Sequence, residues 1–236
     1  MTLFPFVLRS PKRFTDALAE YELIGEGTMR CCFHKKGQPV CYKFYANWLS
    51  QDPTHPRTLK TRMLLILTKH LFWLNINMQE WRYYSGLKAR LPAGLMAAFP
   101  EVLEPVYSTR AGWGLCESFL ANYDGSQGKL VEEEMRRLAG TVRADELYRD
   151  VESFYAQAVA HAVALYDPRN LLVQWISPSA YRLRVVDFEP KAKAAIPGLT
   201  YIKPFVRRRV SGRSQAYLKR LKTIMAQAAG AQGKSE

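Results

Sequence analysis

Residues 21–46 constrain the fold most, because they contain three short apolar segments joined by tight polar links. The segments read YELIGEG, TMRCCFHK and VCYKFYA, and the turn-forming stretch KKGQP connects the second to the third. Short runs rich in β-branched and aromatic residues, bounded by glycine and proline, are typical of strands in hairpins. The sequence therefore predicts a β-meander that opens the domain.

The rest of the chain mixes helical and strand patterns, and 48% of its 236 residues are hydrophobic, which is ample for a packed core. The predicted elements are one long or broken helix over 58–91, strands over 103–110 and 113–123, helix in two segments over 129–166, the second from 144, a hairpin over 171–177 and 181–189, and a helix over 215–229. This order predicts an α+β fold, in which a small sheet with one inserted helix precedes a mainly helical half with one hairpin.

The apolar runs predict neither a signal peptide nor a transmembrane segment. The N-terminal run is short and broken by proline, and the run over 63–76 is interrupted by Lys69 and His70. The cysteines lack the spacing of a zinc site and are expected to be small buried side chains; they are Cys31, Cys32, Cys41 and Cys116. We expect a cytoplasmic protein.

The positive charge is concentrated at the C-terminal end. The net charge is +13, and residues 191–236 hold eleven Lys or Arg against one Glu, which leaves +3 for the first 190 residues. Such a segment could bind an anionic partner, namely nucleic acid, lipid headgroups or an acidic protein face. The alternative is a solvated C-terminal helix without a partner.

A lysine inside an apolar strand follows a glycine-containing turn. Gly25 and Gly27 lie between two predicted strands, where backbone N–H groups can approach phosphates, although Arg30 occupies the third glycine position of the usual pattern. Lys43 comes sixteen residues after Gly27, and burying its ammonium requires a carboxylate partner, for which Glu80 is the candidate. The alternatives are a plain hairpin, a lysine that reaches solvent and a surface Glu80.

Two oxygen-bearing side chains flank the late hairpin. Asp187 follows an apolar strand and precedes an aromatic residue, and seventeen residues separate it from Asn170 across the hairpin. Their oxygens can reach one divalent ion, and hard oxygen ligands suit magnesium. Either residue alone would more often be a turn former.

As a set, these motifs resemble the protein-kinase-like superfamily and, within it, the PhoP regulatory network YrbL family of bacterial proteins. The similarity covers nearly the whole chain, and its matching blocks are residues 24–45, 79–87, 112–125, 164–173 and 196–221. The resemblance implies a bilobal fold that binds ATP and Mg²⁺, with a small antiparallel-sheet lobe over 1–120 and a helical lobe over 121–236.

The resemblance also implies a role for each motif residue. Gly25, Gly27 and Lys43 would hold the ATP phosphates, Glu80 would pair with Lys43, Glu117 and Phe119 would lie in a hinge over 117–120 that lines the adenine pocket, and Asn170 and Asp187 would hold magnesium. Glu189 replaces the flexible glycine of the usual DFG segment, on which switching by a flip of that segment depends.

The catalytic loop lacks its base in this resemblance. Aligning the tripeptide PRN with the PEN of kinases puts Leu165 at the catalytic aspartate, with Val163 and Ala164 at the histidine and arginine. The general base is then absent, or Asp167 takes its place. His161 is better explained as a core histidine. General base catalysis contributes about 10²–10⁴-fold, so slow phosphoryl transfer could survive without it.

Three functions therefore remain open from the sequence. The first is an ATP- and magnesium-binding regulatory protein, a pseudokinase with weak or absent catalysis. The second is an active atypical phosphotransferase that uses Asp167 on a small molecule or an envelope sugar. The third is a nucleic-acid-associated or membrane-associated protein that binds through the basic residues of 203–222.

Overall fold

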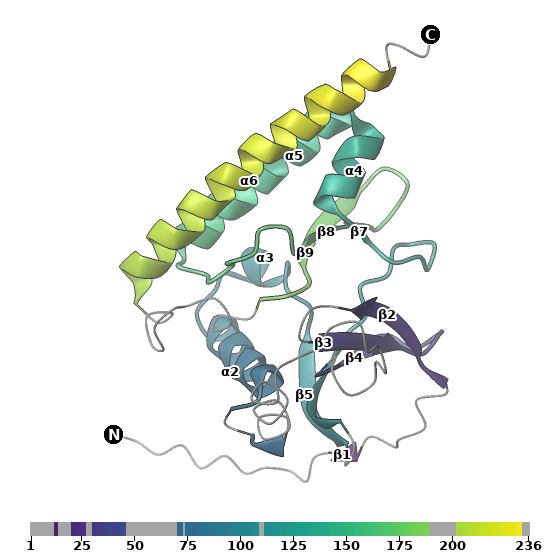
Figure 1. The fold of residues 1–236 in the computed structure, drawn as a ribbon, viewed down its shortest axis with the longest axis vertical. Coiled ribbons are helices and arrows are strands. Elements are labelled where there is room, and N and C mark those ends of the chain that lie inside the picture. Colours follow the sequence, from purple (N-terminus) through teal and green to yellow (C-terminus); the bar gives the residue numbers. More distant parts are fainter. Residues whose placement is uncertain are drawn as a thin grey trace, which may run out of the picture. The chain divides into compact units, whose positions relative to one another are not determined.

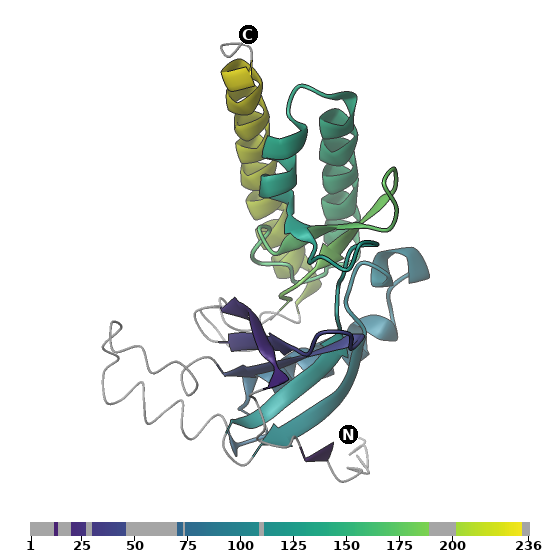
Figure 2. The ribbon, with the colours of Figure 1, turned by 90° about the vertical axis from the view of Figure 1, so that its right-hand side faces the viewer.

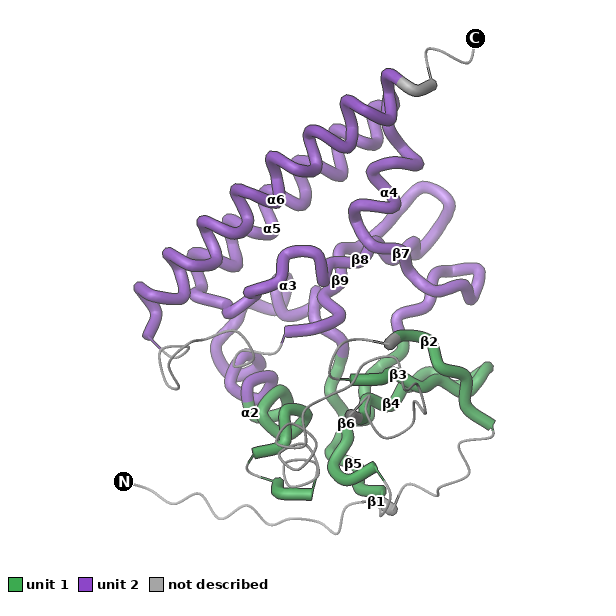
Figure 3. The backbone as a smooth tube through the Cα atoms, viewed as in Figure 1, with its two compact units in different colours: residues 1–82, 101–119 green, residues 83–100, 120–236 purple. Residues whose placement is uncertain are grey.

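The computed structural model shows a mixed α+β fold, as the sequence predicts. It describes residues 12–13, 20–26, 30–45, 70–72, 74–108, 111–188 and 202–232. The chain forms two compact units, the first made of residues 1–82 and 101–119 and the second of residues 83–100 and 120–236 (Figure 3). The predicted division after residue 120 lies next to the last crossing between the units, whereas residues 83–100 group with the second unit.

The first unit is built on a six-stranded sheet with the strand order β1-β5-β6-β4-β3-β2 (Figure 1). Its strands are β1 (Lys12–Arg13), β2 (Glu22–Glu26), β3 (Arg30–His34), β4 (Val40–Tyr45), β5 (Val102–Ser108) and β6 (Gly112–Ser118). All neighbouring strands are antiparallel except β1, which runs parallel to β5. The predicted β-meander is confirmed as β2-β3-β4.

The two faces of this sheet differ in character, because successive side chains of a strand point to opposite faces. One face carries a buried apolar cluster formed by Cys31, Phe33, Phe44, Val106, Ala111 and Cys116. In the register of the sheet, Cys32 lies opposite Lys43 and Cys41 lies opposite Glu117. The opposite face therefore carries charged groups.

Gly114 in β6 lies where the apolar face is most tightly packed. A Cβ atom added there would lie 2.5 Å from Cε1 of Phe44 and 2.6 Å from the carbonyl oxygen of Lys43. We expect Gly114→Ala to lower the free energy of unfolding by about 1–3 kcal/mol, measured by chemical denaturation, because the core must shift to admit the methyl group. The control is Gly86→Ala, which meets no atom within 4 Å. Equal destabilisation by both would contradict this explanation.

Helix α2 (Ile76–Lys88) lies within the range 58–91 for which one long or broken helix was predicted; residues 46–69 and 73 lie outside the described residues. The helix begins after Asn75, whose Oδ1 accepts hydrogen bonds from the backbone N–H groups of Asn77 at 2.9 Å and Met78 at 3.4 Å. The Nδ2 atoms of Asn75 and Asn77 both donate to the carbonyl oxygen of Trp113, at 3.3 and 2.9 Å. The first turn of α2 is thus attached to β6.

The second unit combines a small sheet with helices. Its elements are α3 (Ala93–Met96), β7 (Lys129–Leu130), α4 (Val131–Leu138), α5 (Val142–Ala160), β8 (Leu171–Trp175), β9 (Tyr181–Val185) and α6 (Lys203–Gln232). Strands β7, β8 and β9 form an antiparallel sheet, which confirms the predicted hairpin. Figure 2 shows α4, α5 and α6 packed side by side.

Two predicted helix boundaries are wrong. The break between the two helical segments of 129–166 is confirmed at Gly140, which has a φ of 78°. The second segment ends at Ala160 instead of Tyr166, and Ala162, with a φ of 50°, follows α5. The C-terminal helix begins at Lys203 instead of near residue 215, since Val206 and Val210 extend the buried stripe of α6 by two turns. The buried face of α5 includes Leu147, Val151, Phe154 and Ala158, which recur at helical spacing.

Within the described ranges, none of the helices combines the length and the apolar character that a membrane crossing requires.

Candidate functional site

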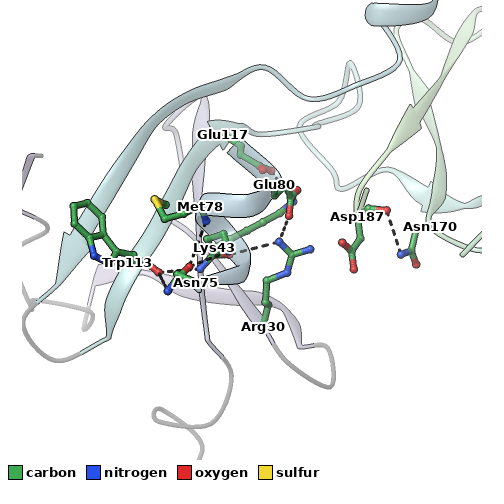
Figure 4. A network of polar contacts seen from close by, with 10 residues as sticks. Arg30, Lys43, Asn75, Met78, Glu80, Trp113, Glu117, Asn170 and Asp187 are labelled. Carbon is green, nitrogen blue, oxygen red and sulfur yellow. Dashed lines mark hydrogen bonds and ion pairs between the residues drawn. The ribbon is translucent and has the colours of Figure 1, made fainter. Parts of the chain in front are cut away.

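Lys43 is buried and paired with two carboxylates (Figure 4). Its Nζ lies 3.2 Å from Oε1 of Glu80 and 2.7 Å from Oε2 of Glu117. Lys43 is 7% exposed, and Glu80 and Glu117 are 0% and 1% exposed. The expected Lys43–Glu80 pair is present, and the alternatives of a lysine reaching solvent and a surface Glu80 do not hold.

Arg30 supplies a second buried cation. Its Nη1 pairs with Oε2 of Glu80 and lies 3.5 Å from Oδ1 of Asn77. Arg30, Lys43, Glu80 and Glu117 come from β3, β4, α2 and β6, and we call them the charge cluster. Two positive and two negative groups, each with a partner, make a neutral set that can be buried.

The sequence analysis identified Arg30 only as the residue that replaces the third glycine of the phosphate-binding pattern. The signal that could have revealed its role is strand alternation, because Arg30 is two residues before Cys32, which lies opposite Lys43. Arg30 and Lys43 therefore share one face of the sheet.

The predicted hinge over 117–120 is anchored to the β3–β4 hairpin. The Phe119 ring stacks on His34 with centroids 3.7 Å apart and an interplanar angle of 15°, and its backbone N–H donates to the carbonyl oxygen of Pro39 at 2.8 Å. Glu117 uses Oε2 for Lys43, whereas its buried Oε1 has no hydrogen-bond partner among the described residues. A buried acceptor in this state is one that a ligand donor can satisfy.

The thiols beside Lys43 influence each other. All four cysteines are free; Cys31, Cys41 and Cys116 are buried, as predicted, and Cys32 is half-buried. The hydrogen bond with Cys41 lowers the pKa of Cys32, with help from Lys43 and Arg30 and against the cost of burial. The same hydrogen bond and burial raise the pKa of Cys41.

The packing around Gly25 gives little support to a phosphate-binding role for the glycine turn. Gly25 is in β2, next to a register irregularity, and a Cβ added there would meet only Cβ of Cys32 at an ordinary 4.0 Å. Gly27 lies outside the described residues, as does Glu189. The phosphate-binding role of this turn stays a prediction.

Asn170 and Asp187 are brought together in the second unit, at one end of the β8–β9 hairpin (Figure 4). Nδ2 of Asn170 donates to the carbonyl oxygen of Asp187 at 3.4 Å, and the N–H of Val186 donates to the carbonyl oxygen of Asn170 at 3.1 Å. The next residue, Phe188, is 1% exposed and packs its ring against Phe99 at 5.3 Å. The backbone next to Asp187 is therefore well anchored.

This oxygen pair fits a magnesium ion in its donor chemistry. Magnesium prefers oxygen ligands, and it commonly takes one or two from protein and the rest from water and phosphate. Both side chains are half-buried, so they remain partly accessible.

The loop before Asn170 holds no base at the aligned catalytic position. Val163, Ala164 and Leu165 are all buried, at 0%, 0% and 4% exposure. The Asp167 carboxylate accepts hydrogen bonds from the backbone N–H of Arg169 at 3.2 Å, its Nε at 2.9 Å and its Nη2 at 2.8 Å. Asp167 thus caps the turn and pairs with its neighbour, which favours a structural role.

His161, considered as a core histidine, is instead the half-buried C-cap of α5. Its carbonyl oxygen accepts a hydrogen bond from Nη1 of Arg90 at 2.7 Å, and the carbonyl oxygen of Ala160 accepts one from Nη2 of Arg207 at 2.9 Å. Guanidinium groups at these carbonyls stabilise the helix end.

Several basic residues of α6 contact the chain itself. Arg213 donates to the carbonyl oxygen of Tyr166, Arg220 pairs with Glu132 at 2.8 Å, and the Arg209 guanidinium lies 5.1 Å from the centre of the Tyr166 ring. These contacts attach α6 to the second unit. They favour a structural role over an anionic partner for this part of the basic segment.

Comparison of the chain with models of known protein families gives no match, and a search of curated proteins gives none either. The resemblance to a kinase-like family therefore rests on the motifs and on the contacts described above.

Proposed function

We propose that this chain is a protein-kinase-like, YrbL-like protein with a bilobal fold, which binds ATP with magnesium and acts chiefly as a regulatory pseudokinase. The observation that carries the proposal is the buried ion pair between Lys43 and Glu80, 3.2 Å apart. A buried lysine paired with a helical glutamate is how kinases prepare a lysine for nucleotide phosphates.

Each motif residue would have its own role in nucleotide binding. Lys43 would contact the phosphates, and the segment containing Glu117 and Phe119 would contact the base. Asn170 and Asp187 would hold magnesium, which would neutralise phosphate charge. Because the charge cluster is itself neutral, phosphate binding should depend strongly on that ion.

Phosphoryl transfer should be slow or absent. Leu165 cannot accept a proton, and the Asp167 carboxylate is held by Arg169 at 2.8–3.2 Å. A missing general base costs about 10²–10⁴-fold in rate. Binding without efficient turnover is what these residues support best.

The variant Asp167→Ala separates this proposal from an active atypical phosphotransferase. We expect unchanged binding of ATP with magnesium, unchanged ATP turnover, and a loss of about 0.5–1.5 kcal/mol in the free energy of unfolding from the lost turn contacts. Calorimetric titration, a phosphate-release assay and chemical denaturation measure the three quantities on the full chain. The control is Asp145→Ala, at an exposed position of α5. A hundredfold fall in turnover specific to Asp167→Ala would instead establish Asp167 as catalytic.

A further inference from the structure

The second unit contains a polar cavity of ≈ 320 Å³ that the proposed nucleotide site does not use. It opens to the surface and is lined by residues of α4, the start of α5, the loop over 122–126 and the β8–β9 hairpin, including Trp175. Its volume is at the small end of the range for ligand pockets. The cavity could therefore hold one small molecule.

The Trp175 ring is held in place by two polar neighbours. Its backbone N–H donates to Oδ1 of Asn122 at 2.8 Å, and its Nε1 donates to Oε1 of Glu134 at 3.4 Å. Trp175 is 8% exposed and Glu134 is 2% exposed, so both are fixed in the packed interior. The cavity wall is a preformed surface.

Two guanidinium groups lie against this ring. The Cζ atoms of Arg137 and Arg143 are 5.6 and 5.7 Å from the centre of the Trp175 ring, within cation–π range. Nε of Arg137 donates to Oε2 of Glu134 at 2.7 Å, and Nη1 of Arg143 donates to the carbonyl oxygen of Pro178 at 3.2 Å. Within the described part of the chain these hydrogen bonds use one nitrogen of each guanidinium, which leaves N–H groups for a ligand.

The charge balance of the cavity favours an anion. Lys129 joins the two arginines in the lining, against the carboxylates of Glu134 and Asp124. Glu134 is committed to Arg137 and Trp175, and Asp124 accepts hydrogen bonds from the N–H and the hydroxyl of Ser126 at 2.9 and 2.6 Å. Both carboxylates have local partners, whereas the cations retain donors.

We propose that this cavity binds a small phosphate monoester. Guanidinium forks match the oxygens of a phosphate group in geometry and charge, so Arg137 and Arg143 would hold the phosphate. The organic part would lie against Trp175 and the exposed ring of Tyr123. The site is independent of the nucleotide proposal, because it uses none of its residues.

The test is a calorimetric titration of the full chain with glycerol 3-phosphate and inorganic phosphate, at constant ionic strength. We expect saturable binding of the ester, tighter than that of inorganic phosphate, and a loss of roughly tenfold or more in affinity for Arg143→Gln. The control variant is Arg149→Gln, which makes the same charge change at an exposed position on α5 outside the cavity. Arg149→Gln and Lys43→Met should both keep the parent affinity.

Three results would overturn the proposal. They are no binding of either probe at millimolar concentration, equal weakening by Arg149→Gln and Arg143→Gln, and equally tight binding of malonate, a dicarboxylate. Thermal unfolding checks that Arg143→Gln is folded. If it is not, Lys129→Gln serves as the second variant and should also weaken binding of the ester.

Discussion

Replacing Glu80 by leucine is expected to lower the free energy of unfolding by about 3–5 kcal/mol. Glu80 is fully buried, and its two carboxylate oxygens face Lys43 at 3.2 Å and Arg30. Leucine has a similar size but removes the carboxylate that pairs with both Lys43 and Arg30. The charge cluster then has a net positive charge, and burying that charge destabilises the folded state. Chemical denaturation of parent and variant measures the difference.

The matched control is Glu146→Leu, because Glu146 is an exposed glutamate in the second turn of α5. A surface substitution of this kind should change stability by no more than about 0.5 kcal/mol. Adding Arg30→Met to Glu80→Leu should recover part of the loss, since it removes the one excess positive charge of the cluster. A loss below about 1 kcal/mol for Glu80→Leu would contradict the description of a tightly coupled charge cluster.

Lys43→Met is expected to weaken the binding of ATP with magnesium by about 10–100-fold. Methionine keeps much of the aliphatic stem but removes the ammonium group that would contact the phosphates. Of the four groups of the charge cluster, it leaves two carboxylates and one cation, so the cluster becomes negative and repels the nucleotide. Isothermal titration calorimetry with the full chain gives the affinity.

The control for this experiment is Lys36→Met, an exposed lysine in the turn between β3 and β4. It removes the same charge from the same unit, so it separates a specific contact from the general positive charge of the protein. The two variants should differ in ATP affinity by the full expected factor. Equal affinities for parent and Lys43→Met would remove Lys43 from the nucleotide site.

Local patterns predicted the strands of both hairpins, and the cost of burying a charge predicted a partner for Lys43. Neither local patterns nor the cost of burial predicted that Glu117 also pairs with Lys43, at 2.7 Å. That contact depends on β6 lying beside β4, where Cys41 pairs with Glu117 across 76 positions of sequence. Strand order in a sheet is set by long-range packing, which no local pattern records.

Local sequence patterns also failed to predict where helices end. The spacing of apolar residues predicted that helix continues to residue 166, but α5 ends at Ala160. The carbonyl oxygens of His161 and Ala162 beyond that end accept hydrogen bonds from Arg90, which lies about seventy residues earlier in the chain. Partners this distant are specified by tertiary structure, and they override the propensity to continue a helix.

ATP binding to the unmodified chain, titrated with and without magnesium, tests the proposed function most directly. We expect saturable binding at one site per chain that weakens strongly when the magnesium is removed. Absence of binding at millimolar ATP with magnesium present would contradict it, and the charge cluster would then be a structural feature of the first unit.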